Sequence, residues 1–142
     1  MPEDANIDSR SPIRKLRDCL HNVDFLQHLK LDELDKLMEV LKRRQCPAGF
    51  TVLKKGDPGD AFYMISTGQV EVWDKTKLLA TRHAGEYFGE SALVSEVPRA
   101  ATIKTTAATE LYVLYKEDFK KILMANPTIA ASIKLHIAKL KY

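Results

Sequence analysis

The sequence predicts an α+β fold in which an eight-stranded β-barrel or jelly roll is flanked by N-terminal and C-terminal α-helices. Apolar residues recur at helical spacing before residue 47 and again after residue 115. Between these segments the chain changes to short runs rich in β-branched and aromatic residues, separated by Gly, Pro and Asp. Six to eight short strands at this spacing are typical of a barrel or jelly roll.

Length and charge restrict the class of protein. A chain of 142 residues suits one domain, and we assign residues 11–142 to it, with residues 1–10 disordered or loosely ordered. The 22 Lys and Arg residues against 19 Asp and Glu give a net charge of only +3, which argues against a nucleic-acid surface. No apolar run approaches the roughly 20 residues that span a bilayer, and the polar N-terminus does not resemble a secretory signal. We expect a cytoplasmic protein without direct membrane insertion.

The helices before the strands are expected within residues 11–46. Ser11 suits an N-cap and Pro12 suits the first helical position, where its missing N–H costs nothing. A second helix is indicated by a stripe of apolar residues at steps of three and four, and Pro47 and Gly49 end the helical pattern. The stripe consists of Leu31, Leu34, Leu37, Met38 and Leu41.

Strands are expected within residues 47–115. The runs that predict them are TVLK (51–54), AFYMI (61–65), QVEVW (69–73), KLLATR (77–82), ATIKT (101–105) and ELYVLY (110–115). Turn residues separate the runs at KGDPGD, STG and HAGEY. Val70 and Val72 alternate with Gln69 and Glu71, which predicts one buried face and one wet face.

Helical spacing returns in residues 116–142. Phe119, Ile122 and Leu123 share one face of a first helix that ends near Pro127. A second helix carries a stripe made of Ile129, Ile133, Ile137 and Leu140.

Residues that could carry out catalysis or hold a metal are not grouped in the sequence. The four histidines and two cysteines show no metal-ligand spacing, and no nucleophile is accompanied by a base. We therefore expect no catalytic residue, no metal and no cofactor. Since jelly-roll barrels also host metal-dependent enzymes of the cupin type, that alternative stays open, although the missing histidine pairs argue against it.

The stretch FGESALVSEVPRAAT (88–102) is the candidate binding site. Gly89 permits a tight turn, after which residues 90–94 can form one helical turn whose first N–H groups attract an anion. Pro98 orients Arg99 so that its planar guanidinium can fold back over the turn and bind phosphate oxygens in pairs. The residues therefore indicate a site for a small anion.

Glu90 would repel a phosphate unless it met a different group of the same ligand, such as a hydroxyl donor. A nucleotide combines a phosphate with ribose hydroxyls, and the small Ala100 and Ala101 leave room for the rest of it. The alternative is a surface ion pair between Arg99 and Glu90 around a tight turn, which is worth about 0–1 kcal/mol.

The same stretch resembles the phosphate-binding cassette of the cyclic nucleotide-binding domain family, whose usual pattern is FGE, a hydrophobic residue, AL, a variable segment and PRAAT or PRTAT. The upstream run KKGDPGDAFYMISTGQVEVW (54–73) also resembles the glycine-punctuated strands of that family. The resemblance covers about residues 16–140. Ser91 departs from the pattern, because the family usually has Leu or Ile there.

The resemblance implies that Glu90 binds the ribose 2′-hydroxyl and Arg99 the exocyclic phosphate. It also implies backbone donors to that phosphate at Ala92 and Ala100, with Gly89 near the ribose. Leu93 corresponds to a residue that relays occupancy to the following helices, or is a plain core leucine. The complete set of expected ligand-binding residues is Phe88, Gly89, Glu90, Ser91, Ala92, Pro98, Arg99, Ala100 and Ala101.

The resemblance further implies a regulatory sensor that performs no chemistry and acts on an effector or a neighbouring domain of a larger protein. Ala100 stands where members that prefer cGMP often have threonine, which favours cAMP as the ligand and leaves cGMP possible. Members of the family cover the base with an apolar or aromatic residue of the C-terminal helices, and Tyr142 is a candidate for this lid; the alternative is that Tyr142 is a frayed terminal residue. The alternative is a degenerate module of this family that serves only protein–protein contacts.

Overall fold

The computed structural model describes residues 30–93, 98–125, 127, 131 and 135, except for the side chains of residues 31, 33, 90, 91 and 123–125. Two α-helices, a 3-10 helix and eight strands follow one another in these segments. In chain order they are α2 (Leu31–Val40), β1 (Lys42–Cys46), β2 (Thr51–Leu53), β3 (Ala61–Thr67), β4 (Gln69–Asp74), β5 (Lys77–His83), β6 (Tyr87–Phe88), η3 (Glu90–Leu93), β7 (Thr102–Thr105), β8 (Thr109–Tyr115) and α3 (Lys116–Ala125).

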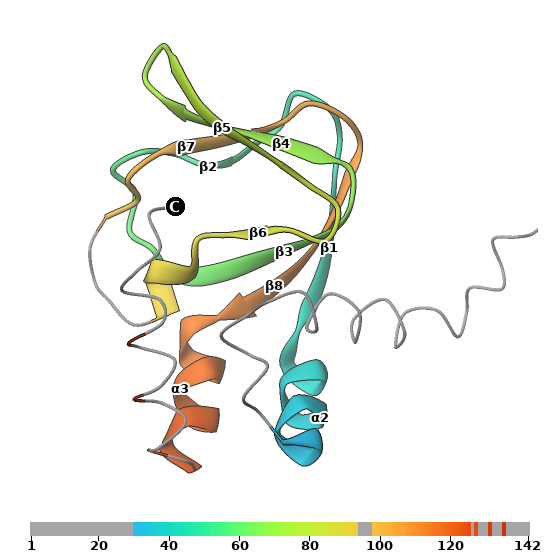
Figure 1. Ribbon diagram of the computed structural model, residues 1–142, viewed down its shortest axis with the longest axis vertical. Coiled ribbons are helices and arrows are strands. Elements are labelled where there is room, and N and C mark those ends of the chain that lie inside the picture. Colours follow the sequence, from blue (N-terminus) through green and yellow to red (C-terminus); the bar gives the residue numbers. More distant parts are fainter. Residues whose placement is uncertain (1–29, 94–97, 126, 128–130, 132–134, 136–142) are drawn as a thin grey trace, which may run out of the picture.

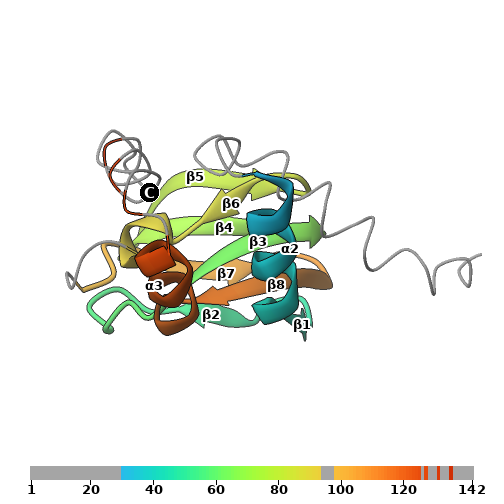
Figure 2. The same cartoon turned by 90° about the horizontal axis from the view of Figure 1, so that it is seen from below.

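The strands form two antiparallel sheets that lie face to face, as Figure 1 shows. One sheet has the strand order β1-β8-β3-β6 and the other β2-β7-β4-β5. Helices α2 and α3 cover the outer face of the first sheet, which is clear when the molecule is viewed from below (Figure 2). The predicted jelly roll with flanking helices is confirmed, and in the described segments its two sheets do not close into a barrel.

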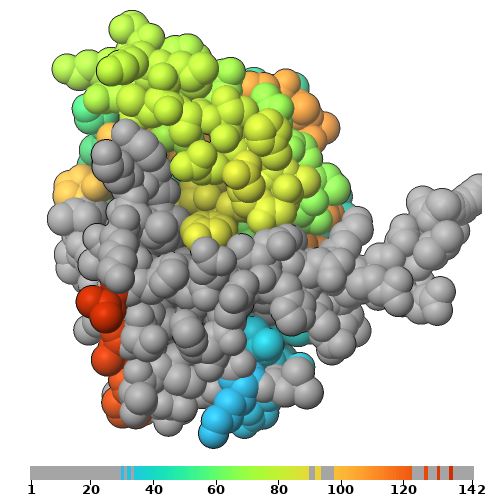
Figure 3. All heavy atoms as spheres, in the orientation of Figure 1, coloured from blue at the N-terminus to red at the C-terminus, as the bar shows by residue number. Residues whose placement is uncertain are grey.

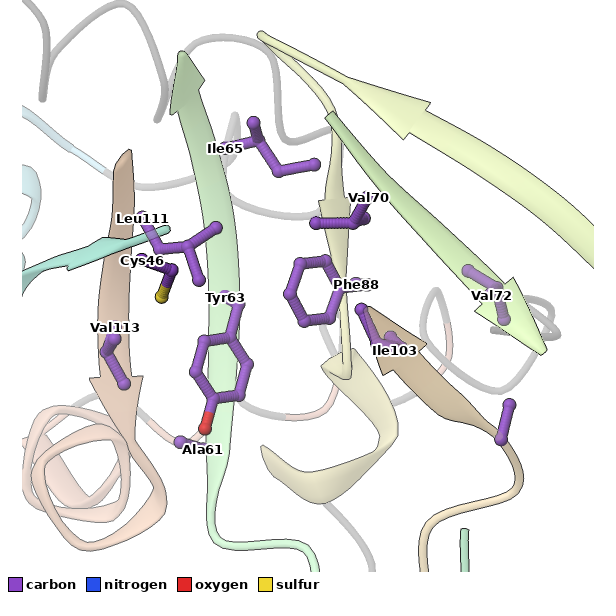
Figure 4. Packing of buried hydrophobic residues seen from close by; sticks show 11 residues of the cluster. Cys46, Ala61, Tyr63, Ile65, Val70, Val72, Phe88, Ile103, Leu111 and Val113 are labelled. Carbon is purple, nitrogen blue, oxygen red and sulfur yellow. The ribbon is translucent and has the colours of Figure 1, made fainter. Parts of the chain in front are cut away.

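Two apolar clusters hold these layers together. The inter-sheet cluster fills the space between the sheets and combines Tyr63 and Phe88 from one sheet with Val70, Val72 and Ile103 from the other (Figure 4). The helix-side cluster lies between the first sheet and the two helices. Its buried members are Leu37, Phe62, Met64, Leu93, Tyr112, Leu114 and Phe119.

Most of the predicted elements are present. Each of the six predicted runs contains a strand, and Val70 and Val72 are buried while Gln69 and Glu71 are only partly covered. Leu37 from the predicted stripe is buried in the helix-side cluster, and Leu34, Met38 and Leu41 pack against that cluster. Helix α3 begins at Lys116, where the helical pattern returns.

The prediction that helix extends to residue 46 is wrong. Helix α2 ends at Val40, and Lys42–Cys46 forms β1, which pairs with β8 from Lys42↔Val113 to Cys46↔Thr109. Lys, Arg and Gln are good helix formers, so the local sequence favours a helix. Pairing with the backbone of β8 stabilises a strand instead.

Strand β6 was also missed, because Tyr87 is the last residue of the predicted turn HAGEY and the strand has only two residues. It pairs with Tyr63 and Met64 of β3. In the space-filling view, β5 and β6 form a continuous yellow-green surface (Figure 3).

Several predictions fall outside the described residues. These are the helix that starts at Ser11 and Pro12, the stripe of Ile129, Ile133, Ile137 and Leu140, and the candidate lid Tyr142.

The turn between β3 and β4 provides a test of close packing. Gly68 has a φ of +99°, and a Cβ atom there would lie 2.7 Å from the Ala108 carbonyl oxygen and collide with the Thr109 hydroxyl. Gly49 has a φ of +76° but open space around its Cα. We expect Gly49→Ala to cost about 1 kcal/mol of unfolding free energy from φ alone, and Gly68→Ala about 2 kcal/mol more. Urea unfolding of both variants measures this difference, and equal losses would contradict it.

Candidate functional site

The first part of the site is the turn that follows β6. Gly89 has a φ of +79°, a conformation that favours glycine, and it leads directly into η3. A Cβ atom at this position would lie 2.9 Å from Nη1 of Arg99, so a side chain there would displace the end of the guanidinium. The predicted helical turn is therefore present as a 3-10 helix. Its Ala92 N–H donates to the Gly89 carbonyl oxygen at 3.2 Å.

Arg99 lies inside this turn with only 7% of its surface exposed. Its Nη2 donates to the carbonyl oxygen of Ala61 at 2.6 Å, and its Nη1 donates to that of Gly89 at 3.2 Å. The arginine thus folds back over the turn as predicted. The guanidinium is therefore buried rather than at the surface. The other partner of the alternative ion pair, the Glu90 side chain, lies outside the described part of the structure.

The loop between β2 and β3 fixes the backbone of Arg99. The N–H of Gly56 donates to the Arg99 carbonyl and the N–H of Arg99 donates to the Asp57 carbonyl, both at 2.8 Å. Pro58 and Pro98 form an isolated antiparallel bridge beside these two bonds. Both ends of the arginine are therefore held, the backbone by this loop and the guanidinium by β3 and Gly89.

Gly59 lies where this loop meets the turn. A Cβ atom at this position would be 3.0 Å from Cβ of Ala92 and 3.4 Å from Cζ of Arg99. A side chain would therefore push against the two residues that the loop brings together. The close approach of the loop depends on the absence of that side chain.

An aromatic pair lies beside the guanidinium. Cζ of Arg99 is 5.9 Å from the ring centroid of Tyr63, and the Tyr63 ring stacks on Phe88 with centroids 5.0 Å apart and planes at 8°. Figure 4 shows the two rings side by side on β3 and β6. Burial raises the pKa of Tyr63, and the positive charge of Arg99 offsets part of that rise. The phenol is therefore neutral at physiological pH.

The other predicted site residues surround Arg99 in different ways. Phe88 and Ala92 are buried, whereas Pro98 and Ala100 are exposed. Ala101, which was expected to leave room for a ligand, packs in the inter-sheet cluster. The backbone of Glu90 and Ser91 starts η3, and their side chains lie outside the described part of the structure.

Sequence reasoning missed the residues that hold Arg99 from outside its own segment. Gly56, Asp57, Gly59 and Ala61 all belong to or follow the stretch KGDPGD, which the sequence analysis assigned to a turn and to the family resemblance but not to the binding site. Its two glycines at a spacing of three were the available signal, because such glycines often permit a close backbone approach.

The arrangement is suited to binding a small anion. A guanidinium has five N–H donors, so it can serve two carbonyl groups and also bind an oxyanion, and its attraction for an anion is strengthened where water is excluded. Among the described residues, no group of His, Cys, Asp and Glu could hold a metal ion. No helix in the described segments is long and apolar enough to cross a membrane.

Comparison with known proteins agrees with this geometry. The sequence model of the cyclic nucleotide-binding domain family matches residues 43–126, which is more than half of the chain. A cAMP-dependent protein kinase regulatory subunit from Emericella nidulans is 35% identical over 106 residues, which cover 73% of this chain and 26% of that subunit. The chain thus spans about a quarter of the length of this relative.

Solved structures show the same fold. The catabolite activator protein of Thermus thermophilus has a TM-score of 0.70 at 28% identity, covering 82% of this chain and 57% of that chain. The regulatory domain of Toxoplasma gondii PKA, crystallised with cAMP, has a TM-score of 0.73 at 24% identity, covering 77% and 43%. The family match, the relatives and the buried arginine beside the turn after β6 agree with one another. The chain belongs to the cyclic nucleotide-binding domain family.

Proposed function

We propose that this domain is a regulatory sensor that binds cAMP in preference to cGMP at the turn formed by residues 88–102. The observation that carries the proposal is the buried guanidinium of Arg99, which is held at both ends beside η3. In this proposal Arg99 binds the cyclic phosphate together with backbone N–H groups of Ala92 and Ala100, and Glu90 binds the ribose 2′-hydroxyl. Ala92 N–H donates to the Gly89 carbonyl oxygen at 3.2 Å, so a bound phosphate would compete with that carbonyl for the same donor.

The preference for cAMP rests on Ala100 and on the relatives. Ala100 is exposed next to the buried arginine and has no hydroxyl for the guanine amino group. The matched regulatory subunit is by name a cAMP-dependent one. A hydroxyl missing from a pocket gives only modest discrimination, so we expect cGMP to bind more weakly rather than not at all.

Transmission of occupancy is proposed to run through Leu93. Its side chain is 2% exposed and lies in the helix-side cluster with Phe119 of α3 and Leu37 of α2. Since Leu93 ends the same turn that Gly89 and Ala92 form, a shift of the turn changes the packing under α3. A ligand moves the helices only by as much as it favours one arrangement over another, and this contact can supply such a difference.

The domain is proposed to act on an effector without catalysing a reaction. The kinase named in the matched regulatory subunits makes a kinase one candidate effector, alongside a neighbouring domain of a longer chain. A cytoplasmic location remains a prediction. The degenerate module that serves only protein contacts is the outcome expected if no cyclic nucleotide binds.

The first test is the affinity of Arg99→Ala for cAMP by calorimetry. We expect a loss of about tenfold or more, because at least one charge-assisted hydrogen bond disappears. Arg99→Lys retains the charge without the planar fork and should fall between the two. Arg82→Ala, which removes an arginine from β5, is the control and should bind as the wild type does. Equal affinity of Arg99→Ala and wild type would falsify the assignment.

The role of Glu90 is tested with 2′-deoxy-cAMP. We expect Glu90→Ala to weaken cAMP binding several-fold and to leave the affinity for the 2′-deoxy ligand almost unchanged, because that ligand lacks the hydroxyl. Calorimetry with both ligands measures the difference. If the mutation weakens both ligands equally, Glu90 does not bind the 2′-hydroxyl.

The role of Leu93 is tested by hydrogen exchange in α3. In the wild type we expect cAMP to change the exchange rates of the amides of α3, and in Leu93→Ala we expect the ligand to bind with a smaller change, because the contact with Phe119 is truncated. Leu111→Ala removes the same atoms from the inter-sheet cluster and is the matched control. A full response in Leu93→Ala would mean that Leu93 is a plain core leucine.

A further inference from the structure

Tyr63 lies beside the proposed phosphate-binding arginine without belonging to the turn that carries it. The Tyr63 side chain is on β3, is 5% exposed, and has its ring centroid 5.9 Å from Cζ of Arg99. This distance is within the range of a cation–π interaction, in which the negative face of an aromatic ring attracts a cation. Tyr63 and Arg99 are 36 residues apart in the sequence, so the fold brings them together.

The ring belongs to a rigid frame that also presents both carbonyl acceptors of Arg99. Tyr63 is opposite Phe88 in the β3–β6 pairing, and the two rings stack. Phe88 directly precedes Gly89, which accepts from Nη1, while Ala61 is two residues before Tyr63 on β3 and accepts from Nη2. The ring and the two carbonyls therefore keep fixed positions relative to one another.

This frame reduces the cost of ligand binding in two ways. A free arginine side chain has many rotamers, and one that is already ordered does not lose that entropy when the ligand binds. An aromatic face also keeps water from that side of the guanidinium, which strengthens its attraction for an anion.

We propose that Tyr63 is a positioning residue for cyclic nucleotide binding: its ring, stacked on Phe88, holds the Arg99 guanidinium in the orientation that receives the phosphate. This inference rests on the proposed function, and it adds a residue outside the turn. It depends on the aromatic face of Tyr63, so phenylalanine can replace tyrosine and leucine cannot.

The experiment measures cAMP affinity by calorimetry for wild type, Tyr63→Phe and Tyr63→Leu. We expect Tyr63→Phe to bind as the wild type does and Tyr63→Leu to bind about three- to tenfold more weakly, the size of a partly desolvated cation–π interaction. Ile65→Ala is the matched control, since Ile65 is buried two residues further along the same face of β3. It should lower thermal stability and leave affinity unchanged.

Two further measurements separate positioning from general support of the core. In the Arg99→Ala background, Tyr63→Leu should cause no additional loss, because the ring then has no guanidinium to hold. Pentafluorophenylalanine at position 63 keeps the ring size and reverses the charge of its face, and it should weaken binding at least as much as leucine. This variant also decides the question if Tyr63→Leu does not fold.

The outcomes distinguish this inference from the proposed function. If the wild type does not bind cAMP or cGMP, the proposed function fails. If the wild type binds and Tyr63→Leu binds equally well, or if Tyr63→Leu weakens binding by the same factor without Arg99, the inference alone is overturned. Unchanged affinity with pentafluorophenylalanine also overturns it.

Discussion

The buried guanidinium of Arg99 is the interaction on which the geometry of this site depends. A buried charge is costly unless hydrogen bonds replace its water, and here backbone carbonyls of Ala61 and Gly89 do so. Both carbonyls are available only when β3 and the turn after β6 are in place, and the Arg99 backbone also needs the loop between β2 and β3. The site is therefore assembled by the whole sandwich rather than by the segment that carries most of its residues.

The position of η3 explains how a small site can affect helices outside the sandwich. The turn has Gly89 and Ala92 on the side of Arg99, and its last residue, Leu93, is in the helix-side cluster with Phe119. Close-packed interiors transmit displacements because they contain few voids. A turn that moves toward a phosphate would therefore change the surface on which α3 packs, while the inter-sheet cluster keeps the strands in place.

Sequence reasoning worked where the signal was local. The alternation at Val70 and Val72, the stripe around Leu37 and the composition of residues 88–102 each depend on neighbours within a few positions, and each led to the correct element. It failed at Lys42–Cys46, which has the composition of a helix end but is paired with a strand more than sixty residues away. It also failed at Tyr87–Phe88, which is too short to have a period.

The sequence by itself determined the class of fold, the turn at Gly89 and the candidacy of Arg99, because spacing, glycine and proline act on the chain locally. Only the tertiary structure decided what holds Arg99. Ala61, Tyr63 and the Gly56–Asp57 backbone reach it from distant positions, through carbonyl and N–H groups that every residue has and through a ring that packs like any core aromatic. Backbone groups have no sequence signature, so their convergence on one side chain can be found only from the fold.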